Sequence, residues 1–380
     1  MSALAGIKVL ELASVLAGPF SGMTLADLGA EVIKLEPPAG DATRGFGPPF
    51  RDGMSAYFAC CNRNKRSLAL DLADPASRPQ LEALVRWADV VIENFRGGVA
   101  ERLGVDPARL AALNPRLVHC SISGYGRDGA AADRPGYDFV VQAEAGLMAV
   151  TGPADGEPCK AGVAVADLFA GQNATIAILA ALRQRERTGR GQHIDIALFD
   201  SQLQMLANVA SAVLFTESEA GRHGNAHASI VPYQAFAAAD GLLAIAVASE
   251  ALWQRFCVAL GQPHWRHDPR YADNAQRVRH RDALVAEIAA IIAPATVADW
   301  IGRLTAAGVP AAPVNGVRDA LRHPLTDARG MRVELDGVPM LGSPLRLSAA
   351  PVGYRRPPPA LDAHADEIRA ELGLAHGASA

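Results

Sequence analysis

Apolar runs alternate with amphipathic segments through the first half of the chain. Short runs rich in Val, Ile and Leu are typical of buried strands, whereas apolar positions spaced by three or four residues indicate helices. The pattern predicts strands at 6–12, 30–35, 67–70, 90–93 and 117–122, with helices at 20–28 and 80–87. Such alternation is typical of a mostly parallel sheet covered by helices on both faces. We therefore predict a Rossmann-like α/β domain.

Longer helices follow from Tyr137 onward. The apolar spacing predicts helices at 138–150, 167–187 and 199–215, with one more strand at 192–198. A polar stretch with several glycines at 217–228 indicates a linker or loop. Beyond it, the pattern predicts a strand at 242–247 and helices near 249–260, 281–292 and 297–307, and hence a second compact unit.

Composition and charge exclude several classes of protein. Half of the 380 residues are hydrophobic and a fifth are charged, which argues against disorder. The 36 basic and 40 acidic side chains give a net charge of -4, so no basic excess is present to bind nucleic acid. No uninterrupted apolar run approaches the roughly 18 residues of a membrane span. The five cysteines lack zinc-site spacing, so we expect no metal and a cytoplasmic, soluble, reduced protein.

A dinucleotide site is the first alternative that the opening segment raises. A strand, a glycine turn, a helix and a second strand that ends in Glu36 are typical of NAD-binding domains. The loop at 16–22 does not contain G-x-G-x-x-G, however, and Pro19 removes an amide that would otherwise face phosphate. A tight turn between packed elements explains these residues better than NAD binding.

Short motifs spread along nearly the whole chain carry a family resemblance. In chain order they are Gly6–Leu12, Ala17–Pro19, Leu28–Pro37, Asn64–Ser67, Glu93–Arg96, Leu113–Arg116, Gly124–Gly126, Arg134–Asp138, Thr188–Gln192, Val231–Tyr233 and Asp240-Gly241. Together they resemble the class III coenzyme A transferase family, which includes formyl-CoA and carnitine-CoA transferases and belongs to an acyl-CoA racemase superfamily. The resemblance implies a large CoA-binding α/β domain at 1–215, a linker and smaller α+β domain at 216–324, and a C-terminal segment at 325–380 that returns to the large domain. It also implies an interlocked homodimer.

The family's catalytic aspartate corresponds to Asp167, at the start of the predicted helix 167–187. By itself, an aspartate at a helix start is more often a capping residue, and helix N-terminal amides favour the ionised carboxylate. The resemblance implies covalent catalysis, in which this carboxylate attacks an acyl-CoA thioester and CoA passes through an aspartyl thioester. No prosthetic group or metal is required, and the CoA thioester is a co-substrate.

Two alternatives share this fold. The racemase branch places a histidine partner thirty residues before the aspartate, where this chain has Tyr137, whose phenol is a poor acid/base group at neutral pH. A non-catalytic CoA-binding protein is the other alternative, and the presence of Asp167 argues against it.

The resemblance also implies a set of CoA contacts in loops that follow strands. They are Leu16, Ala17, Leu70, Asp71, Leu72, Ala73, Asn94, Phe95, Arg96, Arg102, Pro135, Gly136, Tyr137 and Asp138. The chain departs from formyl-CoA transferases at Ser14, Leu16, Pro37 and the loop 227–232. We therefore expect succinyl-CoA as donor and a C4–C5 dicarboxylate as acceptor, with Arg222, His227 or Ser229 near the distal carboxylate.

Overall fold

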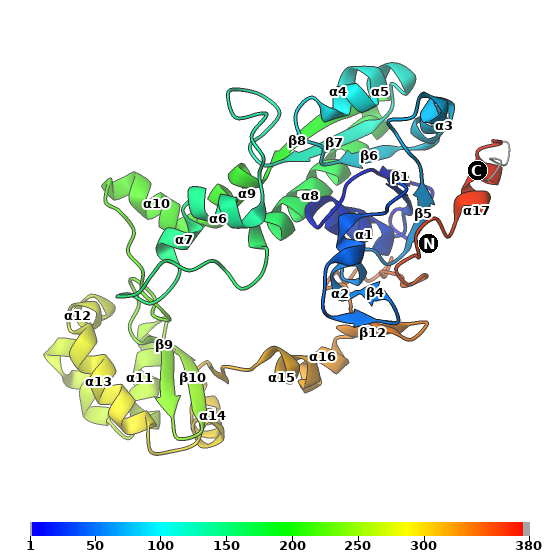
Figure 1. The fold of residues 1–380 in the computed structure, drawn as a ribbon. Coiled ribbons are helices and arrows are strands. Elements are labelled where there is room, and N and C mark those ends of the chain that lie inside the picture. Colours follow the sequence, from blue (N-terminus) through cyan, green and yellow to red (C-terminus); the bar gives the residue numbers. More distant parts are fainter. Residues whose placement is uncertain (1, 375–380) are drawn as a thin grey trace. The chain divides into compact units, whose positions relative to one another are not determined.

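Six parallel strands form the main sheet, in the order β5-β2-β1-β6-β7-β8 (Figure 1). In chain order the strands are β1 (Lys8–Glu11), β2 (Glu31–Glu36), β5 (Lys65–Ala69), β6 (Val90–Glu93), β7 (Val118–Ser123) and β8 (Gln192–Ala197). This is the doubly wound order, which begins in the middle of the sheet and reverses direction between β1 and β6. Loops after β1 and β6 therefore diverge and leave a crevice at the carboxyl ends of the strands.

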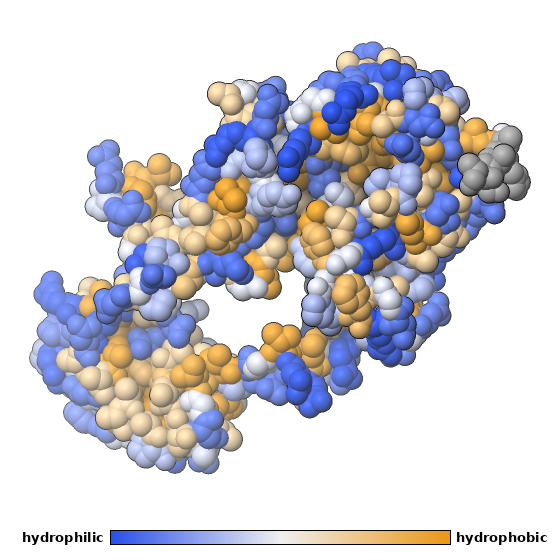
Figure 2. All heavy atoms as spheres, viewed as in Figure 1, coloured by the Kyte–Doolittle hydropathy of each residue, from blue (hydrophilic) through white to orange (hydrophobic). Residues whose placement is uncertain are grey.

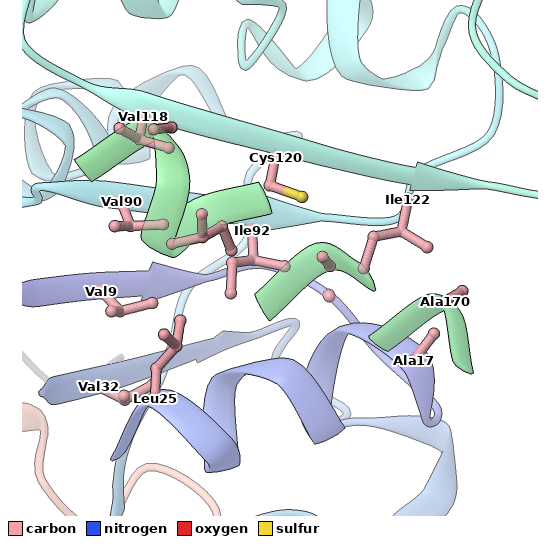
Figure 3. Packing of buried hydrophobic residues seen from close by; sticks show 14 of the residues in the cluster. Val9, Ala17, Leu25, Val32, Val90, Ile92, Val118, Cys120, Ile122 and Ala170 are labelled. Carbon is pink, nitrogen blue, oxygen red and sulfur yellow. The ribbon is translucent and has the colours of Figure 1, made fainter. Parts of the chain in front are cut away.

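The alternation of side chains along each strand builds two hydrophobic layers. Val9 lies in a buried cluster with α1 (Ala17–Asp27) and α8 (Val165–Thr188), shown in Figure 3. Its neighbour Leu10 lies on the opposite face, with α3 (Arg78–Trp87) and α17 (Ala365–Glu371). Helix α8 is long and apolar enough to cross a membrane, but its residues between Ala166 and Leu182 contribute to this buried core. Core packing therefore accounts for its composition.

The computed structural model describes residues 2–374, which divide into two compact units. The main sheet belongs to the larger unit, which comprises the chain up to Met148, Lys160–Ser218 and the chain from Leu325. Its other elements are η1 (Ala42–Gly45), β3 (Phe50–Arg51), β4 (Met54–Ser55), α2 (Ala56–Ala59), η2 (Pro75–Ser77), α4 (Val99–Leu103), α5 (Pro107–Leu113), α6 (Asp138–Glu144), α9 (Leu198–Met205), α10 (Ala207–Thr216), β12 (Arg332–Leu335) and β13 (Val338–Leu341). Short helices α7 (Leu147–Val150) and α16 (Pro324–Ala328) lie at the unit boundaries.

The smaller unit comprises Ala149–Cys159 and Glu219–Pro324 and contains an antiparallel sheet, β11-β10-β9. Its elements are β9 (Tyr233–Ala238), β10 (Gly241–Ala246), α11 (Glu250–Ala259), η3 (Pro263–His267), η4 (Pro269–Tyr271), α12 (Asn274–Arg279), α13 (Arg281–Ile292), α14 (Val297–Ala306), β11 (Ala311–Pro313) and α15 (Val317–Arg322). Helices pack on one face around Trp253 and Phe256. Tyr233 and Leu242 line an open cavity of about 490 Å³ beside the sheet, and hydrophobic residues are visible on the surface of this unit (Figure 2).

The predicted fold class is confirmed, and three predicted helices differ most from the structure. Helix α1 begins at Ala17 instead of residue 20, because Pro19 lies in the first turn, where a helix needs no donor from it. The predicted helix 138–150 is divided into α6 and α7 around Gly146, whose φ is +86°. The predicted helix 199–215 breaks between α9 and α10, where Ala207 has a φ of +40°.

Candidate active site

A cavity of about 200 Å³ lies in the larger unit at the carboxyl ends of the sheet strands. The loop after β1 and the start of α1 contribute residues 14–17, the loop after β6 contributes residues 94–97, and the end of β7 contributes Ser123 and the adjoining Gly124. Asp167 and Tyr137 also line the cavity, to which they bring a carboxyl group and a phenol. The cavity therefore occupies the switch point, where open α/β sheets generally bind ligands.

The loop after β1 is held by polar side chains from neighbouring strands. Asn94 accepts from the amide of Ser14 at 2.9 Å and donates to the carbonyl of the same residue at 2.8 Å. Buried Lys34 donates to the carbonyl of Ala13 at 2.9 Å and pairs with Asp41 at 2.9 Å. Val15 has a φ of +69°, a left-handed conformation that a β-branched residue adopts only when its surroundings enforce it. These contacts therefore supply the constraint that shapes one wall of the cavity.

Helices α1 and α8 approach each other closely beside this wall. A Cβ on Gly171, one turn after Asp167, would lie 2.6 Å from the carbonyl oxygen of Ala17. One turn further along α8, the hydroxyls of Thr175 and Ser21 are hydrogen-bonded at 3.0 Å. The missing side chain at Gly171 thus allows the first turns of α8 to lie against the start of α1.

Asp167 is the third residue of α8, and its side chain is half-buried. Among residues 2–374, no hydrogen bond is made to its carboxylate oxygens. Burial, and then the charge of Asp138, raise the pKa of Asp167 to about 7. This differs from the expectation that helix amides keep the group ionised, because two first-turn amides donate to Asp138 instead. The carboxyl group is therefore poised between its two protonation states near neutral pH.

Tyr57 of α2 is a site residue that the sequence analysis did not identify. It packs in one cluster with Leu16, which lines the cavity, and with Leu168, which follows Asp167 in α8. Burial, and then the charge of Asp167, raise the pKa of Tyr57 to about 12, so its phenol is a neutral hydrogen-bond donor. No local sequence signal marks this position, because its proximity to Asp167 arises only when α2 packs against α1 and α8.

Two arginines supply positive charge to the cavity lining. Arg134 forms an ion pair with Glu144 at 2.8 Å and lies over the ring of Tyr125. Arg96, in contrast, forms no ion pair with any residue in the described part of the chain. A ligand phosphate would find its most available cation there. The described residues contain no group of three or more His, Cys, Asp or Glu side chains arranged to hold a metal.

The predicted CoA contacts fall into two groups. Leu16, Ala17, Asn94, Phe95, Arg96, Gly136 and Tyr137 line the cavity together with Asp167. The remaining predicted contacts lie outside this lining: Leu70, Asp71, Leu72 and Ala73 after edge strand β5, Arg102 on α4, and Pro135 and Asp138 at the start of α6.

Arg222, His227 and Ser229 lie in the smaller unit. The guanidinium of Arg222 donates to the carbonyls of Ala149, Pro153 and Gly156, and so fastens the segment Ala149–Cys159 to this unit. The amide of Ser229 donates to Nδ1 of His227 at 3.1 Å. These contacts give Arg222 a structural role within the unit. The bond between Ser229 and His227 orders the loop at 227–229.

Comparisons with known proteins agree with this geometry. The sequence model of CoA-transferase family III matches residues 4–365. Succinate–glutarate CoA-transferase of Agrobacterium fabrum is 44% identical, over 97% of this chain and 95% of its own. Succinyl-CoA:glutarate CoA-transferase of Mus musculus is 39% identical, over 98% of this chain and 87% of its own. The crystal structure of a CAIB/BAIF family protein from Brucella suis superposes with a TM-score of 0.90 at 45% identity, covering 98% of this chain and 99% of that one.

Proposed function

The chain belongs to CoA-transferase family III, and on this basis we propose that Asp167 carries CoA between an acyl-CoA donor and a carboxylic acid. The observation that carries the proposal is the placement of a half-buried carboxyl group, which accepts no hydrogen bond from the described residues, at the switch-point cavity. A carboxylate in this position can act as a nucleophile toward a thioester whose CoA arm occupies the crevice.

The proposed reaction conserves the free energy of the thioester, because each intermediate is an activated acyl group. An oxygen of Asp167 attacks the thioester carbon, and the C–S bond breaks to give a mixed anhydride and CoA thiolate. The thiolate then attacks the aspartyl carbon and releases the first carboxylic acid, which leaves an aspartyl-CoA thioester. The acceptor carboxylate attacks the carbonyl carbon of this thioester, and the C–S bond breaks to give a second mixed anhydride and CoA thiolate. The thiolate then attacks the acceptor's carbonyl carbon in this anhydride, which forms the new acyl-CoA and releases the carboxylate of Asp167.

The cavity contributes alignment and protection from water to these steps. Each attack develops negative charge on a carbonyl oxygen, which a nearby neutral donor stabilises. We assign that task in part to the phenol of Tyr57, whose raised pKa keeps its proton in place. Burial of Asp167 limits access of water to the anhydride.

We further propose that the predicted CoA contacts bind the arm of the co-substrate. Arg96 is suited to a phosphate because it lines the cavity and forms no ion pair with the described residues. The residues outside the cavity lining, including Asp71 and Arg102, remain expectations for the adenosine and phosphate end. No prosthetic group takes part in the proposed steps.

For substrates we propose succinyl-CoA as donor and a C4–C5 dicarboxylate as acceptor. Support comes from the two relatives, since both names pair succinate or succinyl-CoA with glutarate. His227 and Ser229 remain candidates for contact with the distal carboxylate, whereas Arg222 has contacts that explain it otherwise.

The expected domain division at 1–215, 216–324 and 325–380, the interlocked homodimer and the cytoplasmic location also remain proposals. Leu214 and Phe215 support a partner surface on α10, because they are 79% and 90% exposed. Sedimentation analysis of the purified protein tests the dimer.

The decisive test is to trap the covalent intermediate. Purified protein is incubated with succinyl-CoA and hydroxylamine, and peptide mass spectrometry locates any hydroxamate. We expect a hydroxamate on Asp167, none in Asp167→Ala, and normal labelling in Asp200→Ala, a control that removes an exposed first-turn aspartate of α9. Absence of labelling with succinyl-CoA and with a panel of other acyl-CoA thioesters would reject covalent transfer and favour an isomerase or a binding protein.

A further inference from the structure

The backbone that leads into the catalytic turn is held by a side chain of α6. Oδ1 of Asp138 accepts from the amide of Ala166 at 2.8 Å and, at 3.4 Å, from the amide of Asp167. The residue at the N-cap of α8 is Ala164, which has no side-chain acceptor of its own. Asp138, which lies in α6, therefore provides the side-chain acceptor that a capping residue of α8 would otherwise supply.

Gln142, one turn further along α6, bonds both to Asp138 and to the backbone that leads into α8. The side chain is fully buried, and its Oε1 accepts from the amide of Ala161 at 2.8 Å. Its Nε2 donates to Oδ2 of Asp138 at 2.6 Å and to the carbonyl of Val163 at 3.4 Å. A buried amide with both ends bonded specifies one arrangement, because a shift of the segment would leave polar groups unpaired.

We infer that Asp138 and Gln142 are positioning residues for Asp167: they hold the first turn of α8 in place, and the charge of Asp138 tunes the neighbouring carboxylate. This inference rests on the proposed function of Asp167. It assigns Asp138 a role toward the nucleophile instead of the CoA contact expected from the family resemblance. It also brings Gln142 into the site for the first time.

The effect of Asp138 on the protonation of Asp167 follows from the ionisable groups that surround Asp167. Burial and the charge of Asp138 raise its pKa. The phenol of Tyr57, from α2, is neutral, and the two cavity cations, Arg96 and Arg134, are not among the causes of the shift. A more basic carboxylate is a stronger nucleophile once it is ionised. Transfer activity should therefore rise with pH through about 7, as Asp167 loses its proton.

The test compares Asp138→Asn, Gln142→Leu and wild type for kcat, KM and pH profile with succinyl-CoA. Asp138→Asn keeps the size of the side chain but removes its charge. We expect the acidic limb of its kcat profile to move to lower pH by about half a unit or more, with kcat on the plateau reduced about tenfold. Gln142→Leu should reduce kcat similarly without moving the limb, since the Asp138 charge remains. KM for the acyl-CoA should stay within about twofold in both.

Asp106→Asn is the matched control, because Asp106 also accepts a helix amide, that of Arg109 in α5, but lies outside the cavity lining. It should leave kcat, KM and the limb unchanged. An unmoved limb with a raised KM in Asp138→Asn would overturn the inference in favour of a CoA contact. Unchanged kcat in Gln142→Leu would overturn it too, even if Asp138→Asn failed to fold. Hydroxylamine labelling of wild type is scored separately. Failure of the proposed function is therefore distinguished from failure of the positioning role of Asp138 and Gln142.

Discussion

Replacement of Gly171 by alanine tests whether the close approach of α1 and α8 positions the carboxylate of Asp167, the proposed nucleophile. The added Cβ would lie 2.6 Å from the carbonyl oxygen of Ala17 and 3.3 Å from the ring of Phe20. Ordinary carbon–oxygen contacts are about 3.3 Å or longer, so α8 must move away from α1 by roughly 0.7 Å. The contacting atom is the backbone carbonyl oxygen of Ala17, a residue that also lines the cavity, so it cannot move aside as a flexible side chain would.

Two opposing terms set the change in stability. Overpacking costs about 1–3 kcal/mol, whereas replacing a helical glycine by alanine gains up to about 1 kcal/mol. We therefore expect a net loss of about 0–3 kcal/mol in the free energy of unfolding. The effect on catalysis should be larger in proportion, because Asp167 lies one turn away from the displaced residue. A misplacement approaching 1 Å can cost about 100-fold in rate, so we expect kcat to fall at least about tenfold.

The assay measures kcat with succinyl-CoA and an acceptor dicarboxylate, alongside urea unfolding. Gly302→Ala is the matched control, since Gly302 lies in α14 and no atom lies within 4 Å of its added Cβ. The control should gain up to about 1 kcal/mol and keep full activity. Wild-type kcat in Gly171→Ala, with an equal gain in stability, would refute the argument that this contact positions the nucleophile.

Two further predictions concern buried charge and pH. Lys34→Met leaves buried Asp41 without its ion-pair partner and removes one of the two buried lysines that pair with Glu11, so urea unfolding should report a loss of about 3–5 kcal/mol. The exposed pair of Arg86 with Glu82 should contribute less than about 1 kcal/mol when Arg86→Met is measured in the same way. Burial lowers the pKa of His119 from 6.5 to about 3; its neutral form is stable in the core, and the folded state loses stability as pH falls below 6.5. His119→Phe, beside a cavity of about 70 Å³, should therefore be more stable than wild type by about 2 kcal/mol at pH 5, and a wild-type pH dependence in this variant would count against the argument.

The sequence by itself determined the fold class and the identity of the candidate nucleophile. Strand and helix periods are local properties, and they predicted β6 at its observed bounds and most of the other elements that they indicated to within a few residues. The helix breaks after Gly146 and Leu206 were missed because the apolar spacing continues across both of them. Asp167 was identified only through the family resemblance, since an aspartate that opens a helix has the same local pattern whether it caps or reacts.

The tertiary structure decided the surroundings that give Asp167 its chemical character. Tyr57 of α2 and Asp138 of α6 lie near Asp167, and Gly171 of α8 allows α1 to pack beside it. Their importance depends on distances between segments that are far apart in the chain, and the pattern of hydrophobic and polar positions does not encode those distances. The raised pKa of Asp167 has the same origin, because burial and a neighbouring charge exist only after the helices have packed.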